Sequence, residues 1–192
     1  MIGAVVPVKR LSHAKSRLSS RLSPQDRAEL VVDLVTRTVT ILRQAGVVNR
    51  VALATSETTL AGLVGADVLP DGGSLNAALS GAAEWARGIG ASALLIVPAD
   101  LPLLETADVQ AVVEAATAPV GVVVAPTGDG GTGALLLQPP DALVPSFGPE
   151  SYRRHVDAAH RAGVPVRTVT RPGLARELDT VADLEELSGL CR

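Results

Sequence analysis

Short, continuously apolar runs alternate along this chain with longer segments in which apolar residues recur every three or four positions. The runs are rich in β-branched residues and predict buried strands, whereas the longer segments predict helices with one buried face. The predicted strands cover residues 2–8, 51–55, 67–69, 93–97, 120–125, 134–137 and 164–170. The predicted helices cover residues 24–45, 57–64, 75–88, 106–116 and 181–190, with a further helix that begins within 147–151 and runs to residue 162.

This regular alternation indicates the fold class. Strands that are apolar on both faces are typical of a mainly parallel sheet covered by helices on both sides. We therefore expect an α/β fold with one doubly wound, Rossmann-like sheet, in a single domain over residues 1–192. Local signals support the first helix, because Ser23 and Pro24 are placed to begin it and Gly46 to end it.

The composition limits the partners of the protein. Apolar residues make up 47% of the chain, yet it holds one Phe, one Tyr and one Trp, so aromatic platforms for stacking nucleobases are essentially absent. A formal net charge of -3 argues against a nucleic acid or an acidic membrane as partner of the whole surface. The single cysteine, Cys191, excludes an intramolecular disulfide and a cysteine metal cluster. The first apolar run is too short for a signal peptide or a membrane span, so we expect a cytoplasmic protein.

Both lysines of the chain, Lys9 and Lys15, lie in the loop after the first predicted strand, although fifteen arginines are spread along the sequence. No acidic residue precedes Asp26, so this loop is locally positive within an acidic protein. A lysine ammonium is a compact charge on a flexible stem and commonly grips phosphate oxygens. The loop therefore predicts an anion site. The alternative is an ordinary solvated basic loop in which the two lysines fall by chance.

Polar residues that follow the strands are the candidates for a site, because ligands of such sheets bind outside the carboxyl ends of the strands. The first loop holds no glycine, which argues against a dinucleotide fingerprint and a P-loop, and so against hydride transfer and kinase-type phosphate binding. Asp100 ends an apolar strand between two prolines, and Asp179 precedes the last predicted helix. Two acids and a basic loop suit a polyphosphate with Mg²⁺. Each acid also has a plain structural alternative, a turn for Asp100 and a helix cap for Asp179.

Two further segments suit an anion. The turn over residues 128–133 is rich in glycine, which allows backbone N–H groups to approach a ligand closely, and Thr132 adds a hydroxyl. The segment 147–151 places Ser151 at a helix start, a natural anion site. A flexible hairpin turn and a plain helix entry are the alternatives. His155 and His160 fit no metal-ligand or Ser-His-Asp pattern, and we expect both on a helix surface.

Taken together and in this order, the motifs resemble those of a known family. They are Val6-Pro7-Val8-Lys9, Ala14-Lys15-Ser16-Arg17-Leu18, Pro98-Ala99-Asp100-Leu101-Pro102, Gly131-Thr132, Phe147-Gly148-Pro149 with Ser151 and His155, and Leu178-Asp179-Thr180. Over nearly its whole length the chain resembles the 2-phospho-L-lactate or phosphoenolpyruvate guanylyltransferases of coenzyme F(420) biosynthesis, within the MobA-like nucleotidyltransferases. The resemblance implies a nucleotide-diphospho-sugar transferase-like fold. It also implies a GTP-dependent enzyme that joins GMP to the phosphate of a three-carbon phospho-acid and releases pyrophosphate.

On the nucleotide side, the resemblance implies two groups of residues. The loop after the first strand would bind the GTP phosphates through Lys9, Lys15 and Arg17. A second segment would lie beside the nucleobase, with Gly73, Ser74 and Asn76 as nucleotide-binding residues. Lys9 and Lys15 would also be catalytic, together with Asp100.

On the other side of the reaction, the resemblance implies a metal site and an acid site. Asp100 and Asp179 would hold Mg²⁺, and Glu177 is a further acid beside them. Thr132, Gly148 and Ser151 would bind the phospho-acid. Gly133 departs from the pattern, since the family often carries a polar Asn or Thr after the Gly-Thr pair.

Two other functions are open to this sequence. One is a MobA-like nucleotidyltransferase for another acceptor, such as a molybdenum cofactor precursor, although the glycine-rich first loop of those enzymes is absent here. The other is a non-catalytic nucleotide-binding regulator, against which Asp100 and Asp179 argue. The expected partners are GTP and phosphoenolpyruvate or 2-phospho-L-lactate, with no nucleic acid and no membrane. A homodimer is left open.

Overall fold

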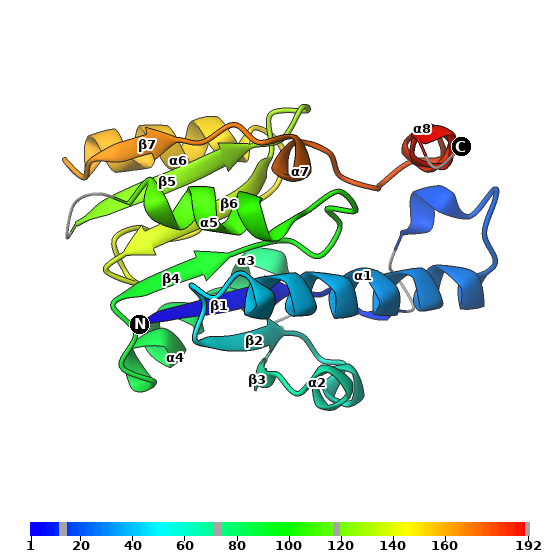
Figure 1. The fold of residues 1–192 in the computed structure, drawn as a ribbon, viewed down its shortest axis with the longest axis horizontal. Coiled ribbons are helices and arrows are strands. Elements are labelled where there is room, and N and C mark those ends of the chain that lie inside the picture. The colour runs from blue at the N-terminus through cyan, green and yellow to red at the C-terminus, as the bar shows by residue number, and fades with distance from the viewer. Residues whose placement is uncertain (12–14, 71–73, 117–119, 191–192) are drawn as a thin grey trace.

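The chain folds around a seven-stranded sheet in the order β3-β2-β1-β4-β6-β5-β7, as seen in a computed structural model that describes residues 1–11, 15–70, 74–116 and 120–190 (Figure 1). β6 runs antiparallel to its neighbours β4 and β5, and the other neighbouring pairs are parallel. The expectation of a mainly parallel α/β sheet is confirmed. The strands are β1 (Ile2–Pro7), β2 (Arg50–Ala54), β3 (Asp67–Leu69), β4 (Ala93–Ile96), β5 (Gly121–Pro126), β6 (Thr132–Gln138) and β7 (Val166–Thr168).

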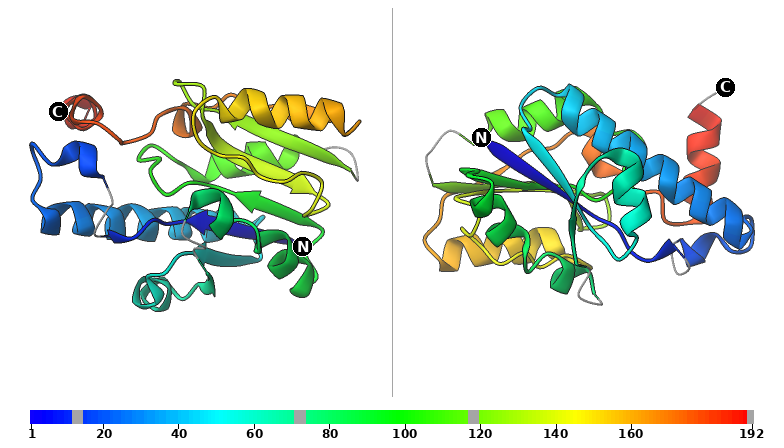
Figure 2. Two further views of the ribbon diagram at one scale, coloured as in Figure 1. Left: turned by 180° about the vertical axis from the view of Figure 1, so that it is seen from behind. Right: turned by 90° about the horizontal axis from the view of Figure 1, so that it is seen from below.

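Helices cover both faces of the sheet (Figures 1 and 2). One face carries α1 (Pro24–Gln44), α2 (Thr58–Val64), α5 (Thr106–Glu114) and α7 (Pro172–Ala175). The other carries α3 (Leu75–Ala78), α4 (Ala82–Gly88) and α6 (Ser151–Arg161).

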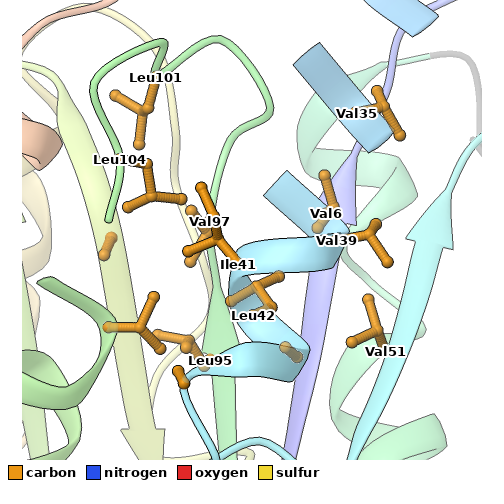
Figure 3. Close-up of a cluster of buried hydrophobic side chains, with 14 of the residues drawn as sticks. Val6, Val35, Val39, Ile41, Leu42, Val51, Leu95, Val97, Leu101 and Leu104 are labelled. Carbon is orange, nitrogen blue, oxygen red and sulfur yellow. The ribbon is translucent and has the colours of Figure 1, made fainter. Parts of the chain in front are cut away.

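The two helical layers explain the continuous apolar runs of the strands. Successive residues of a strand point to opposite faces, so Val5 and Val6 of β1 belong to different hydrophobic clusters. Figure 3 shows Val39 and Leu42 of α1 in the cluster that contains Val6. Because both faces are buried, every strand position favours an apolar residue and no alternation with polar residues remains.

The ends of α1 agree with the sequence prediction. The Ser23 hydroxyl accepts a hydrogen bond from the backbone N–H of Asp26 at 3.2 Å, and the Asp26 carboxylate accepts one from the Ser23 N–H at 3.1 Å. This reciprocal capping satisfies two backbone donors at the start of the helix. Gly46 follows the helix with φ +73°, a backbone conformation that glycine adopts without strain.

Besides shifts of a residue or two at the ends of other elements, the structure differs from the prediction in three ways. The helix predicted over residues 75–88 is two helices, α3 and α4, because the Ser80 hydroxyl bonds back to the Ala77 carbonyl at 2.7 Å and Gly81 is the N-cap of α4. Two elements were not predicted, the 3₁₀ turn η2 (Ser16–Leu18) and α7, since one turn is too short for a periodic pattern. The last strand is β7, shorter than the predicted 164–170.

The last helix, α8 (Val181–Leu190), lies beyond the sheet, beside the loop that precedes α1 (Figures 1 and 2). An ion pair between Arg21 and Glu185, at 2.8 Å, joins this loop to α8. Segments from the two ends of the chain therefore meet at one edge of the molecule. None of the helices in the described ranges is long and apolar enough to cross a membrane.

Candidate active site

A cleft of about 550 Å³ opens at the edge of the sheet where β1 and β4 end. Because β6 is antiparallel, its first residue lies at this same edge, so Thr132 joins residues that follow the parallel strands. The polar residues and glycines that line the cleft come from five segments, and they include Lys9, Lys15, Arg17, Asp100, Asp129, Thr132, Gly148, Ser151, Glu177 and Asp179. Apart from Asp129, these residues were predicted separately from five parts of the sequence, and they share one space. Of the predicted nucleobase segment, Leu75 lines the cleft, whereas Ser74 and Asn76 are not among its described lining residues.

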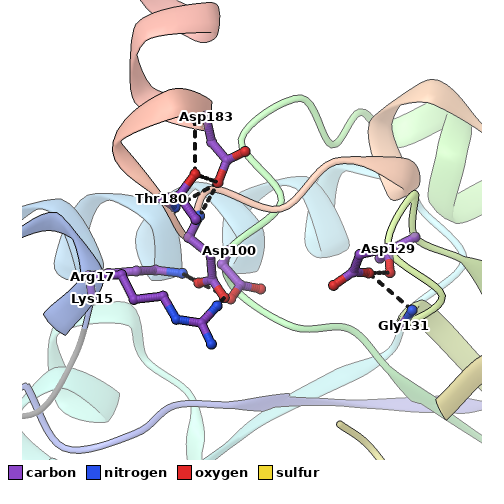
Figure 4. Close-up of polar contacts among 9 residues, drawn as sticks. Lys15, Arg17, Asp100, Asp129, Gly131, Thr180 and Asp183 are labelled. Carbon is purple, nitrogen blue, oxygen red and sulfur yellow. Dashed lines mark hydrogen bonds and ion pairs between the residues drawn. The ribbon is translucent and has the colours of Figure 1, made fainter. Parts of the chain in front are cut away.

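Lys15 lies between two carboxylates in this cleft. Its Nζ is 2.9 Å from Asp100 Oδ2 and 2.6 Å from Asp179 Oδ1, and its side chain is only 9% exposed (Figure 4). Burial lowers the pKa of the Lys15 ammonium, but attraction and hydrogen bonds from the two carboxylates outweigh it and hold the pKa above its ordinary value. Lys15 also adopts a left-handed backbone conformation, with φ 51°, which is uncommon outside glycine. A solvated loop with lysines placed by chance does not account for these features.

The backbone brings the two acids together. The N–H of Leu178 donates to the carbonyl oxygen of Asp100 at 2.9 Å, which places Asp179 beside the end of β4. Asp179 does not cap α8, since Thr180 and Asp183 do so instead, with the Asp183 carboxylate accepting the N–H of Thr180 at 2.6 Å (Figure 4). The carboxylate of Asp179 is therefore free to face Lys15.

Two more carboxylates face the same part of the cleft. Burial raises the pKa of Glu177 to about 7, and the nearby charges of Asp100, Asp129 and Asp179 add to this effect. Asp129 is held by hydrogen bonds from the Thr127 hydroxyl and from the Gly131 N–H, at 3.0 Å, and its pKa is lowered by the first of these bonds. Sequence reasoning did not select Asp129, although it lies within the predicted glycine-rich turn.

The outer basic residues are more exposed. Arg17 is 74% exposed, and its nearest nitrogen is 4.0 Å from Asp179. Lys9 is exposed as well and lines the cleft after β1. Both side chains are thus available to an anion that enters from solvent.

The opposite wall carries two buried hydroxyls. Thr132 Oγ1 and Ser151 Oγ are 2.9 Å apart, and Thr132 Oγ1 is 3.1 Å from Nδ1 of His155. The expectation that His155 lies on a helix surface is wrong, because its side chain is fully buried, whereas His160 of the same helix is exposed as expected. A helical period shows which residues share a face of the helix but not which face is buried. In α6 the buried face is the one that carries Ser151 and His155.

Besides Thr132, two groups contact the imidazole of His155. Its Nε2 accepts the N–H of Ser146 at 2.9 Å, and the Phe147 ring meets it edge-on with 5.2 Å between ring centres. Burial lowers the pKa of His155 to about 4, with a smaller contribution from the positive charge of Arg154. The imidazole is therefore neutral at physiological pH.

The predicted nucleobase segment contacts the hydroxyl wall. The Asn76 side chain accepts the N–H of Phe147 at 2.8 Å and donates to its carbonyl at 3.3 Å. Ser74 caps α3 by accepting the N–H of Ala77 at 3.2 Å, and Gly73 lies outside the described residues. Gly148, next to Phe147, has φ +115°, which requires glycine. The segment 74–76 and the segment 147–151 are thus joined through Asn76.

Within the described residues, no group of three or more His, Cys, Asp or Glu side chains is arranged to hold a metal ion.

The mainly parallel α/β sheet is similar to the fold of nucleotide-diphospho-sugar transferases. A putative nucleotide-diphospho-sugar transferase from Desulfovibrio desulfuricans superposes with a TM-score of 0.80 over 97% of this chain and 85% of its own, at 17% identity. This likeness shows the fold.

The sequence places the chain more narrowly. The chain belongs to the family described as "Guanylyl transferase CofC like", whose model matches residues 2–188. It is 46% identical to the phosphoenolpyruvate guanylyltransferase of Rubrobacter xylanophilus, over 96% of this chain and 92% of that protein. It is 44% identical to the phosphoenolpyruvate guanylyltransferase of Sphaerobacter thermophilus, over 97% of this chain and 92% of that protein.

Proposed function

We propose that this protein is a guanylyltransferase that transfers GMP from GTP to the phosphate of phosphoenolpyruvate and releases pyrophosphate, a step of coenzyme F(420) biosynthesis in the cytoplasm. The observation that carries the proposal is the single cleft of about 550 Å³ with a basic loop and paired acids on one wall and buried hydroxyls on the other. The names of the relatives favour phosphoenolpyruvate over 2-phospho-L-lactate as the acceptor.

In this proposal the loop after β1 binds the triphosphate. Lys9 and Arg17, both exposed, meet the phosphates first, and Lys15 contributes a buried charge close to the reacting groups. Ammonium and guanidinium groups both bind phosphate oxygens with charge-assisted hydrogen bonds. The segment that holds Gly73, Ser74 and Asn76 lies beside the base of the nucleotide.

The opposite wall binds the phospho-acid. Thr132 and Ser151 offer hydroxyls that line the cleft, and Gly148 allows the backbone to approach an anion without a side chain in between. Ser151 is also the first residue of α6, where the helix dipole favours negative charge. A three-carbon acid with a carboxylate and a phosphate matches these donors.

A divalent cation, which we take to be Mg²⁺, suits the residues between the two walls. The Oδ1 atom of Asp100 is buried and has no hydrogen-bond partner within the described part of the chain, an expensive arrangement for a carboxylate oxygen. Asp100 and Asp179 would hold the cation, and Glu177 is a further acid in the same cleft. When bound, Mg²⁺ neutralises charge on phosphate oxygens.

The chemistry needs no general base. The phosphate group of the acceptor is mostly dianionic at neutral pH and is already nucleophilic. One of its oxygens forms a bond to the α-phosphorus of GTP while the bond from that phosphorus to the bridging oxygen breaks and pyrophosphate leaves. The protein aligns the two substrates, and Lys9 and Lys15 stabilise the charge that develops on the leaving group. Both ring nitrogens of His155 are within hydrogen-bond distance of protein atoms, Thr132 Oγ1 and the Ser146 N–H, which is consistent with a site that uses no histidine base.

A panel of acceptors tests the proposal. The pure protein is incubated with GTP and Mg²⁺ and with phosphoenolpyruvate, 2-phospho-L-lactate or 3-phosphoglycerate, and pyrophosphate release is measured with ATP in parallel. We expect release with GTP and phosphoenolpyruvate. No release with any three-carbon phospho-acid would rule the proposal out, and GTP binding without release would indicate a regulator instead.

Replacing Asp100 tests the metal-binding role. Asp100→Asn keeps the size of the side chain and removes its charge, so we expect turnover to fall at least about a hundredfold while the melting temperature stays close to that of the wild type. Asp33→Asn, an exposed change on α1, is the matched control. Unchanged pyrophosphate release by Asp100→Asn would remove this residue from the site.

A further inference from the structure

Three buried polar side chains lie together at the cleft. Thr132 and Ser151 line the cleft, and His155 lies behind them, fully buried. The distances join them in a chain, with 3.1 Å from His155 Nδ1 to Thr132 Oγ1 and 2.9 Å from Thr132 Oγ1 to Ser151 Oγ. A buried histidine with no part in the chemistry proposed above needs another explanation.

The tautomer of His155 follows from its second neighbour. Nε2 of His155 is 2.9 Å from the backbone N of Ser146, and a backbone N–H can only donate. Nε2 must therefore carry a lone pair. In the neutral ring the proton is then on Nδ1, which donates to Thr132 Oγ1. A charged ring would set two donors against each other at Ser146, in agreement with the lowered pKa of His155.

This tautomer determines whether the hydroxyl pair of Thr132 and Ser151 can donate a hydrogen bond to a molecule in the cleft. Thr132 and Ser151 have two hydroxyl protons, and the bond between them uses one. Because His155 donates to Thr132, the other proton remains available to a molecule in the cleft. If Nδ1 accepted instead, Thr132 would donate to His155 and Ser151 to Thr132, and no donor would remain.

We propose that His155 is a positioning residue that makes the Thr132–Ser151 pair a hydrogen-bond donor to an anionic group, carboxylate or phosphate, of the acid substrate. The inference rests on the proposed function for the identity of that substrate. Phe147 supports the role, because its edge contact with the imidazole keeps the ring in the orientation that serves both Ser146 and Thr132.

Two substitutions separate the two hydrogen bonds of His155. In His155→Asn the amide nitrogen lies near the position of Nδ1 and donates to Thr132, while the acceptor for Ser146 is lost. In His155→Gln the amide reaches the position of Nε2 and accepts from Ser146, while the donor to Thr132 is lost. We expect His155→Gln to raise the KM for phosphoenolpyruvate about tenfold and His155→Asn to raise it by less than about threefold. The KM for GTP stays within about twofold in both.

A double variant tests whether His155 acts through the hydroxyl pair. In a Thr132→Val background, which has no hydroxyl to receive the bond, we expect His155→Gln to add less than a twofold further rise in KM for the acid. His160→Gln, an exposed change on the same helix, is the control and leaves both KM values unchanged. Full additivity of the two changes would overturn the proposal.

The tautomer is measurable in the unaltered protein, whether or not the variants fold. Nitrogen-15 NMR of the labelled imidazole distinguishes a proton on Nδ1, which we expect, from one on Nε2, which would overturn the inference. Equal KM effects of His155→Asn and His155→Gln, or a rise in the KM for GTP alone, would overturn it too. Calorimetric titration with phosphoenolpyruvate distinguishes a failure of the proposed function from a failure of the proposed role of His155. Failure of the wild-type protein to bind it removes the proposed function, whereas normal binding by His155→Gln removes only the role of His155.

Discussion

Lys15 shows why one position of an arginine-rich chain holds lysine. Its ammonium contacts carboxylates from two loops, at 2.9 and 2.6 Å, in a space where its side chain is 9% exposed. A lysine stem ends in a compact charge that fits between two carboxylates, whereas the planar guanidinium of arginine is wider and directs its donors in a fixed fork. Lys9, in the same loop, is exposed and has no such constraint.

Removing Lys15 should weaken the folded state as well as GTP binding. In Lys15→Ala, Asp100 and Asp179 face each other without a cation, so we expect the free energy of unfolding to fall by about 2 kcal/mol, less than for a fully buried pair because both acids are partly exposed. Urea denaturation with a chelator present measures this. Lys9→Ala is the matched comparison and should change stability by less than about 0.5 kcal/mol. Equal stability of the two variants would contradict the expectation.

His155 should make stability depend on pH. Its pKa is about 4 in the folded protein and 6.5 without burial, so the unfolded chain takes up a proton first as the pH falls. The stabilisation is complete above pH 6.5 and is lost progressively as the pH falls towards 4. When the pH falls from 7.5 to 5, we expect the free energy of unfolding of the wild type to decrease by about 2 kcal/mol more than that of His155→Asn. Parallel denaturation curves of the two proteins at both pH values test the sign and the size.

Among the elements, α7 and β6 depend on a close backbone contact. A Cβ added to Gly133 of β6 would lie 2.0 Å from the carbonyl oxygen of Leu174 in α7, so a side chain there has no space. The chain runs from α7 to Glu177 and Asp179, which gives this contact a part in placing the acids. The glycine that departs from the family pattern therefore has a structural reason in this protein.

Gly133→Ala should move α7 away from the sheet. We expect a loss of about 3 kcal/mol of stability and a fall in turnover, because the segment that carries Asp179 moves with α7. Gly62→Ala, within α2, is the matched control, since nothing lies within 4 Å of its added Cβ and alanine favours a helix by about 0.5 to 1 kcal/mol. A Gly133→Ala protein as stable as Gly62→Ala would show that the contact can relax without cost.

The break between α3 and α4 illustrates the limit of periodicity. Leu79, Ala82 and Ala86 are buried in one hydrophobic cluster, so the predicted apolar face is present. The same face continues across a helix break when the second helix packs on the same layer. Periodicity therefore predicted the burial and missed the two ends, which Ser80 and Gly81 form through local hydrogen bonding and backbone freedom.

At the scale of the whole molecule, the antiparallel β6 divides the cleft into two halves. Residues after β1 and β4 form one half, and the start of β6 with the entry to α6 forms the other. Asn76 links the segment beside the first half to the backbone of Phe147 in the second. This arrangement suits a reaction between two substrates, each held by one half.

The division of the cleft into two halves predicts that a substitution in one half changes the KM for one substrate and not for the other. We expect Ser151→Ala to raise the KM for phosphoenolpyruvate about tenfold, since a donor to an anion is lost, with the KM for GTP within about twofold. Arg17→Ala, an exposed change in the other half, should raise the KM for GTP about fivefold and leave the KM for the acid nearly unchanged. Initial rates with each substrate varied in turn measure both constants. A parallel rise of both in either variant would mean that the halves are not independent.

The apolar pattern was sufficient for the layered α/β sheet, because a strand buried on both faces and a helix buried on one leave different periodicities in the chain. Topology then placed Lys15, Asp100 and Asp179 among the candidates, since ligands gather where parallel strands end. The distances among these residues and the burial of His155 were decided only in three dimensions. They depend on contacts between residues far apart in sequence, such as the hydrogen bond from Leu178 to Asp100, and no local pattern encodes such a contact.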